Sequence, residues 1–173
     1  SQDRNAARMK FDEHCDLLFS TPFKKRIKKQ IRANGQEALI MNNGAQYRIV
    51  TPNATGARGL TVDLAIIDEA LTHSLSLSAA IAPTMATKPS AQMWLASNAG
   101  GPYSYLLAHY RKLGHAKNPA LSWHEWAPYQ DNFDIHDPEV WAQAIPTLND
   151  KHGVTLQAVE EASQTTDPQI FAQ

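Results

Sequence analysis

Cysteine is nearly absent from this sequence. Cys15 is the single cysteine among 173 residues, so the chain cannot form an internal disulfide, as is usual in a reducing cytosol. The residue falls within an amphipathic pattern, and nothing near it in the sequence would activate its thiol. We therefore interpret Cys15 as a buried, unreactive packing residue rather than a nucleophile.

Long hydrophobic runs are also missing. No apolar stretch reaches the roughly 18 residues of a membrane-spanning helix, and no basic-then-apolar segment with a small-residue cleavage site opens the chain. We therefore expect neither a membrane partner nor a secretion signal. Hydrophobic residues make up 43% and charged residues 19%, the composition of an ordinary globular domain with a sizeable core.

The net charge of -1 conceals an uneven distribution of charge. Residues 1–117 carry 15 Lys or Arg and 8 Asp or Glu, a balance of +7, whereas residues 118–173 carry 1 and 9, a balance of -8. The segment 119–138 is also rich in aromatic and polar residues. Both observations predict a boundary near residue 118, between one part that spans 1–117 and another that spans 118–173.

Hydrophobic periodicity and turn residues divide the chain into helices and strands. The predicted helices cover residues 2–19, 22–33, 74–82, 103–113, 138–144, 156–163 and 168–172. The predicted strands cover residues 37–41, 46–51, 64–68 and 92–96, with a further edge strand over 121–126. The first two strands form a hairpin, and the apolar runs at 64–68 and 92–96 are typical of strands buried on both faces of a parallel sheet. The predicted fold class is therefore α/β with crossover connections.

Two carboxylates end the first of these apolar strands. Asp68 and Glu69 directly follow Leu64–Ile67, and ligands of open α/β sheets bind beyond the carboxyl ends of strands. Because Mg²⁺ takes one or two carboxylates and keeps water and phosphate oxygens, Asp68 is a candidate magnesium ligand, directly or through water. Glu69 is a candidate base for a water that attacks a terminal phosphate. An Asp-Glu pair that begins a loop or caps the next helix fits the same pattern.

The second apolar strand ends in small polar residues, Ser97 and Asn98. The stretch between the two strands is long enough for a crossover helix, so the strands are predicted to be parallel neighbours. Ser97 and Asn98 would then share the sheet edge with Asp68 and Glu69, where they can hydrogen-bond a phosphate oxygen or the attacking water. An ordinary strand exit rich in turn formers is the alternative.

Basic residues stand out in two places. Arg58 lies between Gly56 and Gly59, ahead of the acidic strand, where it can neutralise a phosphoryl group in cis or from a neighbouring subunit; a surface arginine is the alternative.

Residues 24–32 contain six bases, and on a helix they would leave Phe23, Ile27 and Ile31 as an apolar stripe. Such a surface suits DNA phosphates, and a solvated helix face fits equally well.

The motifs resemble, in order and spacing, those of the large subunit of tailed-bacteriophage terminases, the motor that packages viral DNA into procapsids. The likeness begins at the turn that contains Asn43-Gly44 and continues with Arg58-Gly59. LAIIDEA is similar to the family's Walker B segment, and LASNAG is similar to its coupling motif. Residues 137–148 are similar to the family's linker segment, although Ile145 stands where an asparagine is more usual.

The resemblance implies that 1–117 forms part of a P-loop-type ATPase sheet and that 118–173 forms a small, mostly helical linker subdomain. The phosphate-cradling GxxxxGK[ST] loop of such ATPases is absent from the sequence. The family's complete chain joins an ATPase domain with that loop to an RNase H-like nuclease. We therefore expect this sequence to correspond to the region after the loop and before the nuclease, which leaves open whether the chain by itself binds ATP or cleaves DNA.

The resemblance also implies cofactors, partners and roles for individual residues. The cofactors are ATP and Mg²⁺, with Asp68 binding the metal, Glu69 acting as catalytic base and Ser97–Ala99 coupling hydrolysis to movement. Arg58 is the candidate arginine finger, supplied to a neighbour in a homo-oligomeric ring. The implied partners are double-stranded viral DNA, the terminase small subunit and the portal, in the host cytoplasm and transiently at the procapsid.

Two other interpretations stay open. A DExx-box helicase or another DNA translocase shares the acidic strand, but it would carry arginine motifs downstream, and after Lys117 the only base is Lys151. The second interpretation is a non-catalytic, degenerate module that binds DNA or a partner subunit, and the missing phosphate loop supports this interpretation. Whether this chain is itself an enzyme is therefore open.

Overall fold

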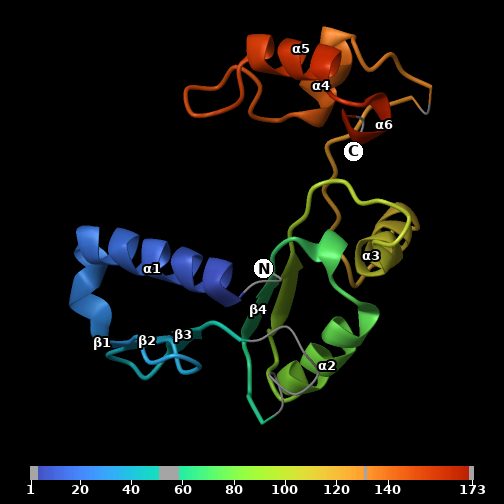
Figure 1. The fold of residues 1–173 in the computed structure, drawn as a ribbon. Coiled ribbons are helices and arrows are strands. Elements are labelled where there is room, and N and C mark those ends of the chain that lie inside the picture. The colour runs from blue at the N-terminus through green and yellow to red at the C-terminus, as the bar shows by residue number, and fades with distance from the viewer. Residues whose placement is uncertain (1–3, 51–58, 131, 172–173) are drawn as a thin grey trace. The chain divides into compact units, whose positions relative to one another are not determined.

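A computed structural model describes residues 4–50, 59–130 and 132–171 of the chain (Figure 1). The chain forms two compact units, Ser1–Ala108 and His109–Gln173, which are described separately. The division falls within a helix, α3 (Tyr105–His115). The functional division at residue 118 into an ATPase part and a linker stays a prediction.

Unit 1 begins with a helix on a small antiparallel sheet. Helix α1 (Arg4–Ser20) lies along one face of the sheet formed by β1 (Ile27–Ile31), β2 (Ala38–Met41) and β3 (Gln46–Arg48), in the order β1-β2-β3 (Figure 1). Phe11, Cys15 and Leu39 are fully buried between helix and sheet. The predicted burial of Cys15 and the predicted hairpin are thus confirmed, and burial raises the pKa of the Cys15 thiol.

The helix predicted over 22–33 is wrong. Only a short 3-10 helix, η1 (Pro22–Arg26), forms there, and the chain then enters strand β1. A spacing of four residues, as between Ile27 and Ile31, suits one face of a regular strand as well as of a helix, so the pattern alone does not decide between the two. Tertiary pairing decides between the two, because Ile27 pairs with Met41 and packs against the buried cluster under α1.

The second part of unit 1 contains a parallel strand pair. Strands β4 (Leu64–Ile67) and β5 (Gln92–Leu95) pair from Leu64 with Gln92 to Ile67 with Leu95, as predicted. Between them run the 3-10 turn η2 (Ala70–Thr72) and helix α2 (Leu75–Met85), which continues past Pro83 for two residues.

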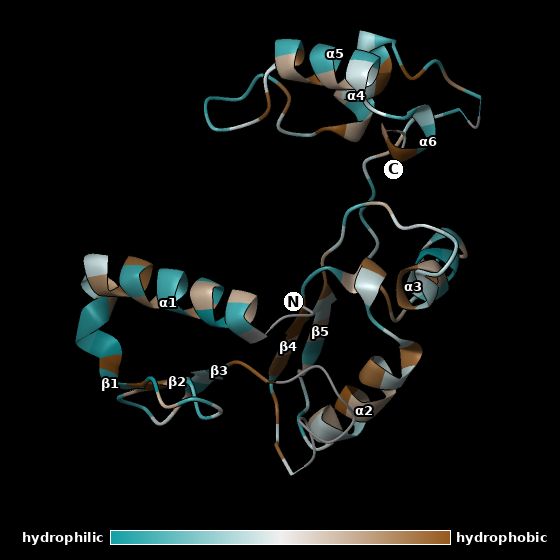
Figure 2. Ribbon diagram, viewed as in Figure 1, coloured by the Kyte–Doolittle hydropathy of each residue, from teal (hydrophilic) through white to brown (hydrophobic). Residues whose placement is uncertain are grey.

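The expectation that these two strands are buried on both faces is wrong for this chain. Strand β4 is apolar along its length (Figure 2), and Ile67 is buried. However, Ile66 is 64% exposed and its pairing partner Trp94 is 62% exposed. The two residues share one face of the pair, so that face has no covering layer in the described part of the chain.

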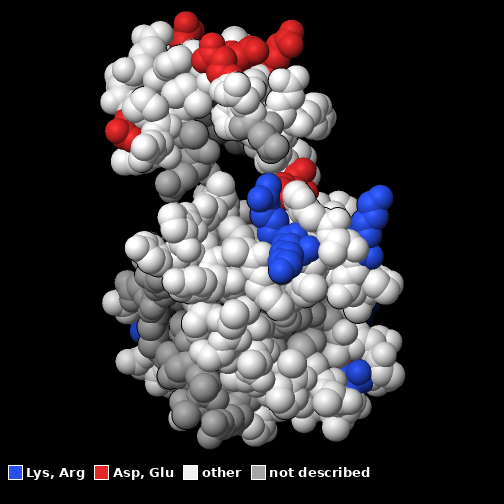
Figure 3. Space-filling view, turned by 90° about the vertical axis from the view of Figure 1, so that its right-hand side faces the viewer, with Lys and Arg blue, Asp and Glu red and all other residues white. Residues whose placement is uncertain are grey.

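Unit 2 is mostly helical. After α3 it contains α4 (Pro138–Ala144), α5 (Leu156–Thr165) and α6 (Pro168–Phe171), close to the predicted bounds. On the face seen in Figure 3, the part with α4–α6 shows acidic side chains and no basic ones, in line with the acidic composition of this region. Within the described ranges, none of the helices has the length and apolar character needed to cross a membrane.

The edge strand predicted over 121–126 does not form, and the segment is irregular. Instead, Glu125 of this segment binds α3 by accepting hydrogen bonds from Arg111 and His115. Helix α3 continues through Gly114 to His115, past the predicted end at residue 113. A Cβ at Gly114 would collide with the Trp123 ring, so the glycine permits this close approach.

Candidate functional site

The carboxyl ends of β4 and β5 lie side by side. Ala96 N–H donates to Ile67 O over 2.9 Å, and Ala70 N–H donates to Ala96 O over 3.0 Å, so pairing continues past the ends of both strands. These bonds bring the exit that carries Asp68 and Glu69 next to the exit that carries Ser97 and Asn98. The predicted juxtaposition is therefore present, and all four residues are exposed to solvent.

Glu69 has an unusual backbone conformation. Its φ of 54° and ψ of 48° lie in the left-handed region, which costs a residue with a Cβ about 1 kcal/mol. Asp68 Oδ1 accepts the Glu69 N–H over 3.0 Å, and the Thr72 hydroxyl donates to Glu69 O over 2.9 Å. Two hydrogen bonds therefore hold the left-handed conformation. This conformation turns the chain at the position of the candidate carboxylates.

Ser97 has a partner that sequence reasoning did not identify. Its Oγ accepts a hydrogen bond of 3.0 Å from the backbone N–H of Leu71, in the turn that follows Glu69. The hydroxyl therefore joins the exit of β5 to the turn η2, which holds Glu69. Within the described ranges the hydroxyl donates no hydrogen bond, so its proton can be directed to a ligand oxygen.

His73 is a further residue that sequence reasoning missed. It is half-buried just after η2, and burial lowers the pKa of its imidazole, while the charges of Glu69 and Asp68 act in the opposite direction. The lowered pKa favours the neutral imidazole, which can offer a ring nitrogen as a hydrogen-bond acceptor. Only its position within five residues of Asp68 hinted at this in the sequence.

The donor set suits Mg²⁺ bound together with a phosphate group. Asp68 can supply the single carboxylate that such a magnesium site needs from the protein, with water and phosphate oxygens completing the coordination, which leaves Glu69 for another role. Among the described residues no group of three or more His, Cys, Asp or Glu side chains is arranged to hold a metal ion. Residues 51–58, including the candidate arginine finger Arg58, lie outside the described residues.

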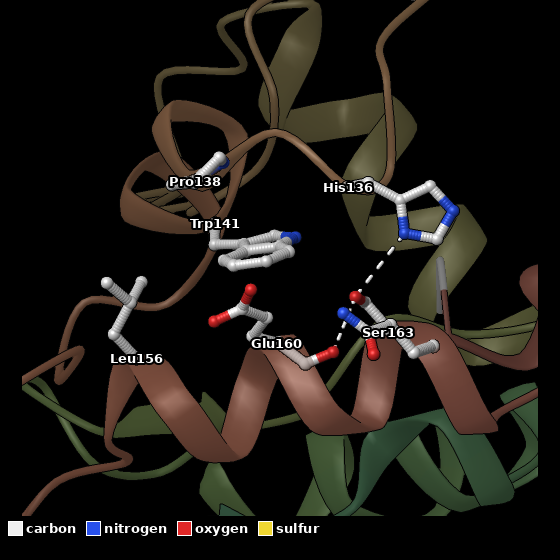
Figure 4. A pocket seen from close by; sticks show the side chains of 7 residues that line it. His136, Pro138, Trp141, Leu156, Glu160 and Ser163 are labelled. Atoms are coloured by element: carbon white, nitrogen blue, oxygen red, sulfur yellow. Dashed lines mark hydrogen bonds between the residues drawn. The ribbon is translucent and has the colours of Figure 1, made fainter.

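A separate hollow of about 490 Å³ lies within unit 2, between α4 and α5 (Figure 4). The indole of Trp141 lines the hollow and donates from Nε1 to Ile135 O over 2.7 Å. Ser163 Oγ donates to Glu160 O, so it accepts its 3.3 Å hydrogen bond from Nδ1 of His136. Because these polar groups bind one another, we interpret the hollow as part of the packing of this unit.

Comparison with known proteins defines the class of fold. The chain has a mixed α/β, terminase-like fold: the crystal structure of the HK97 bacteriophage large terminase superposes on it with a TM-score of 0.80. The two sequences are 17% identical, and the match covers 98% of this chain and 36% of that one. This chain therefore spans about a third of the length of that terminase. No protein-family model and no curated protein matches the sequence.

Proposed function

We propose that this chain is the carboxylate-bearing and linker portion of a terminase large subunit, which hydrolyses ATP to move viral DNA into a procapsid. The observation that carries the proposal is the shared edge of β4 and β5, where Asp68 and Glu69 adjoin Ser97 and Asn98. The likeness in fold to a phage large terminase supports the same assignment.

In this proposal each residue has a separate role. Asp68 holds Mg²⁺, which neutralises charge on the phosphoryl oxygens. Glu69 orients the attacking water and accepts its proton. Asn98 donates its amide to a phosphate oxygen, and Ser97 transmits displacement of the β5 exit to the Glu69 turn through its bond to Leu71. Arg58 would reach a phosphoryl group of a neighbouring subunit.

The remaining parts of the active site and the partners are also proposals. A glycine-rich loop with a lysine must hold the phosphates, and it has to come from outside these 173 residues. A ring of subunits would supply Arg58 in trans, and the small subunit and portal would position the ring on DNA. This machinery would work in the host cytoplasm, at the procapsid.

The test uses a polypeptide that carries this segment together with a phosphate loop. Glu69→Gln should lower kcat for ATP about 100-fold or more while ATP binding persists, because only the base is removed. Asp68→Asn should raise the Mg²⁺ concentration needed for hydrolysis. Asp63→Asn is the matched control, because Asp63 is an exposed carboxylate just before β4 and bonds Lys88 instead.

Hydrolysis at wild-type rates by the Glu69→Gln variant would refute the proposed role of Glu69. A nucleotide titration of the 173-residue chain gives a second check. Tight binding of Mg-ATP in the absence of any phosphate loop would contradict the view that these residues form only half of the active site.

A further inference from the structure

A strongly basic surface lies at the entry to the antiparallel sheet of unit 1. Its members are exposed cations on η1 and the start of β1. They are Lys24, Lys25, Arg26, Lys28 and Lys29, and we name this set the basic ribbon.

The basic ribbon is not neutralised by the described part of the protein. None of its five side chains forms an ion pair with a described acidic residue, whereas the nearby Arg32 lies 3.9 Å from Asp12. The segment 22–36 contains no acidic residue, and the next one, Glu37, is buried. Five positive charges therefore face solvent over six positions of the chain, which is unfavourable unless an anion is nearby.

The backbone that carries the basic ribbon is held in place. Thr21 Oγ1 caps η1 by accepting the Phe23 N–H over 3.2 Å. Asn42, in the turn between β2 and β3, donates its side-chain amide to Lys25 O over 2.9 Å and its backbone N–H to Arg26 O over 2.8 Å. The cations thus project from an ordered backbone, so binding an anion would require ordering of their side chains alone.

An irregularity in β1 adds to the exposure of its lysines. The register with β2 shifts between Ile27 and Lys29, so that Lys28 has no partner across the strand. Lys28 and Lys29 are consequently both exposed, while Ile27 is half-buried and packs against the cluster under α1.

Protection of an edge strand is a competing explanation for part of this pattern. Strand β1 is an edge of the three-stranded sheet, and lysines and bulges on such edges prevent pairing with other chains. That explanation accounts for Lys28 and Lys29. It does not account for Lys24, Lys25 and Arg26, which precede the strand and lie on η1.

We propose that the basic ribbon binds the phosphate backbone of duplex DNA without reading its sequence. The choice of duplex DNA as the anion rests on the proposed function; the surface itself is argued from charge and geometry. Lysine and arginine that contact phosphates release condensed counterions, and this release makes such binding steeply dependent on salt.

The experiment measures binding of a labelled duplex of mixed sequence to the full chain by fluorescence anisotropy at several salt concentrations. If all five cations contact phosphates, raising the salt from 50 to 200 mM should weaken binding about 500-fold. Lys24→Gln/Lys25→Gln and Lys28→Gln/Lys29→Gln should each reduce that salt effect to about 40-fold, because two contacts are lost. Circular dichroism and sedimentation of each variant verify folding and monomer size.

A matched control separates the surface from net charge. Lys112→Gln/Lys151→Gln removes the same two charges from exposed positions of unit 2 and should leave affinity and salt dependence unchanged. If the control variant weakens DNA binding as much as the basic-ribbon variants do, the proposal is overturned. It is also overturned if the basic-ribbon variants bind DNA like the wild type but self-associate, because that result supports edge protection instead. Binding to vesicles rich in phosphatidylserine in place of the duplex would overturn it too. The experiment needs no nucleotide, so a failure to bind DNA would leave the ATPase proposal standing. Failure of the ATPase proposal would likewise leave a measured affinity of the basic ribbon for DNA unchanged.

Discussion

Removal of the Glu125 carboxylate should destabilise unit 2 by an amount that depends on pH. Glu125 accepts hydrogen bonds from Arg111 Nε at 2.7 Å, His115 Nε2 at 2.7 Å and Trp123 Nε1 at 2.9 Å. Burial alone would raise its pKa, but the bonds from His115, Trp123 and Arg111 outweigh burial and lower the pKa from 4.5 to about 2.

The size of the effect follows from that pKa. A group whose pKa is lower in the folded state stabilises that state when the pH is above the pKa of the group in the unfolded chain. The contribution is lost as the pH falls toward the pKa in the folded state. The full shift corresponds to about 3 kcal/mol, and solvent screening of the half-exposed Arg111 and His115 reduces this to about 2 kcal/mol. The contribution should be complete above pH 5, and more than half of it should be gone at pH 3.

The measurement is urea unfolding followed by tryptophan fluorescence at pH 6 and pH 3 for the wild type and Glu125→Gln. The free energy of unfolding should differ by about 2 kcal/mol at pH 6 and by less than half of that at pH 3. Glu13→Gln is the control, because Glu13 bonds Lys10 at 2.8 Å on the open surface and should contribute little. A difference for Glu125→Gln that is the same at both pH values would refute the assignment to charge.

Two further predictions concern the exits of β4 and β5. Ser97→Ala should speed hydrogen exchange at the Leu71 amide about tenfold, because the amide loses its acceptor, and Ser97→Thr should restore protection. Unchanged exchange in the alanine variant would show that the bond is absent in solution. Glu69→Gly should raise the free energy of unfolding by about 1 kcal/mol, since glycine adopts a φ of 54° without strain, whereas Glu69→Ala should not raise it. A glycine variant that is less stable than the wild type in thermal unfolding would contradict the strained conformation.

Local patterns in the sequence determined several elements of this fold. The helical spacing in α1 and the Asn43-Gly44 turn of the hairpin act over a few residues, so they can be read without knowledge of the fold. The apolar runs at β4 and β5 predicted both strands, and the length between them predicted that they are parallel. The shared edge with Asp68 and Glu69 followed from that topology.

Other features depended on contacts between distant residues. Ile27 and Ile31 fit a helix or a strand equally well, and pairing with β2 decided for the strand. Segment 121–126 has strand-like composition, but its Glu125 binds three donors, two of them on α3. No local pattern reports the two partners on α3, because they lie ten or more residues away in the sequence.

The candidate site shows the same division. The sequence by itself determined which chemical groups end β4 and β5, because strand length and polarity are properties of a few consecutive residues. Only the tertiary structure decided that Glu69 adopts a left-handed backbone, that Ser97 binds the turn after it, and that the basic residues 24–29 line a short turn and a strand instead of a helix. Each of these outcomes depends on a hydrogen bond or a strand pairing between segments that the chain brings together only when it folds.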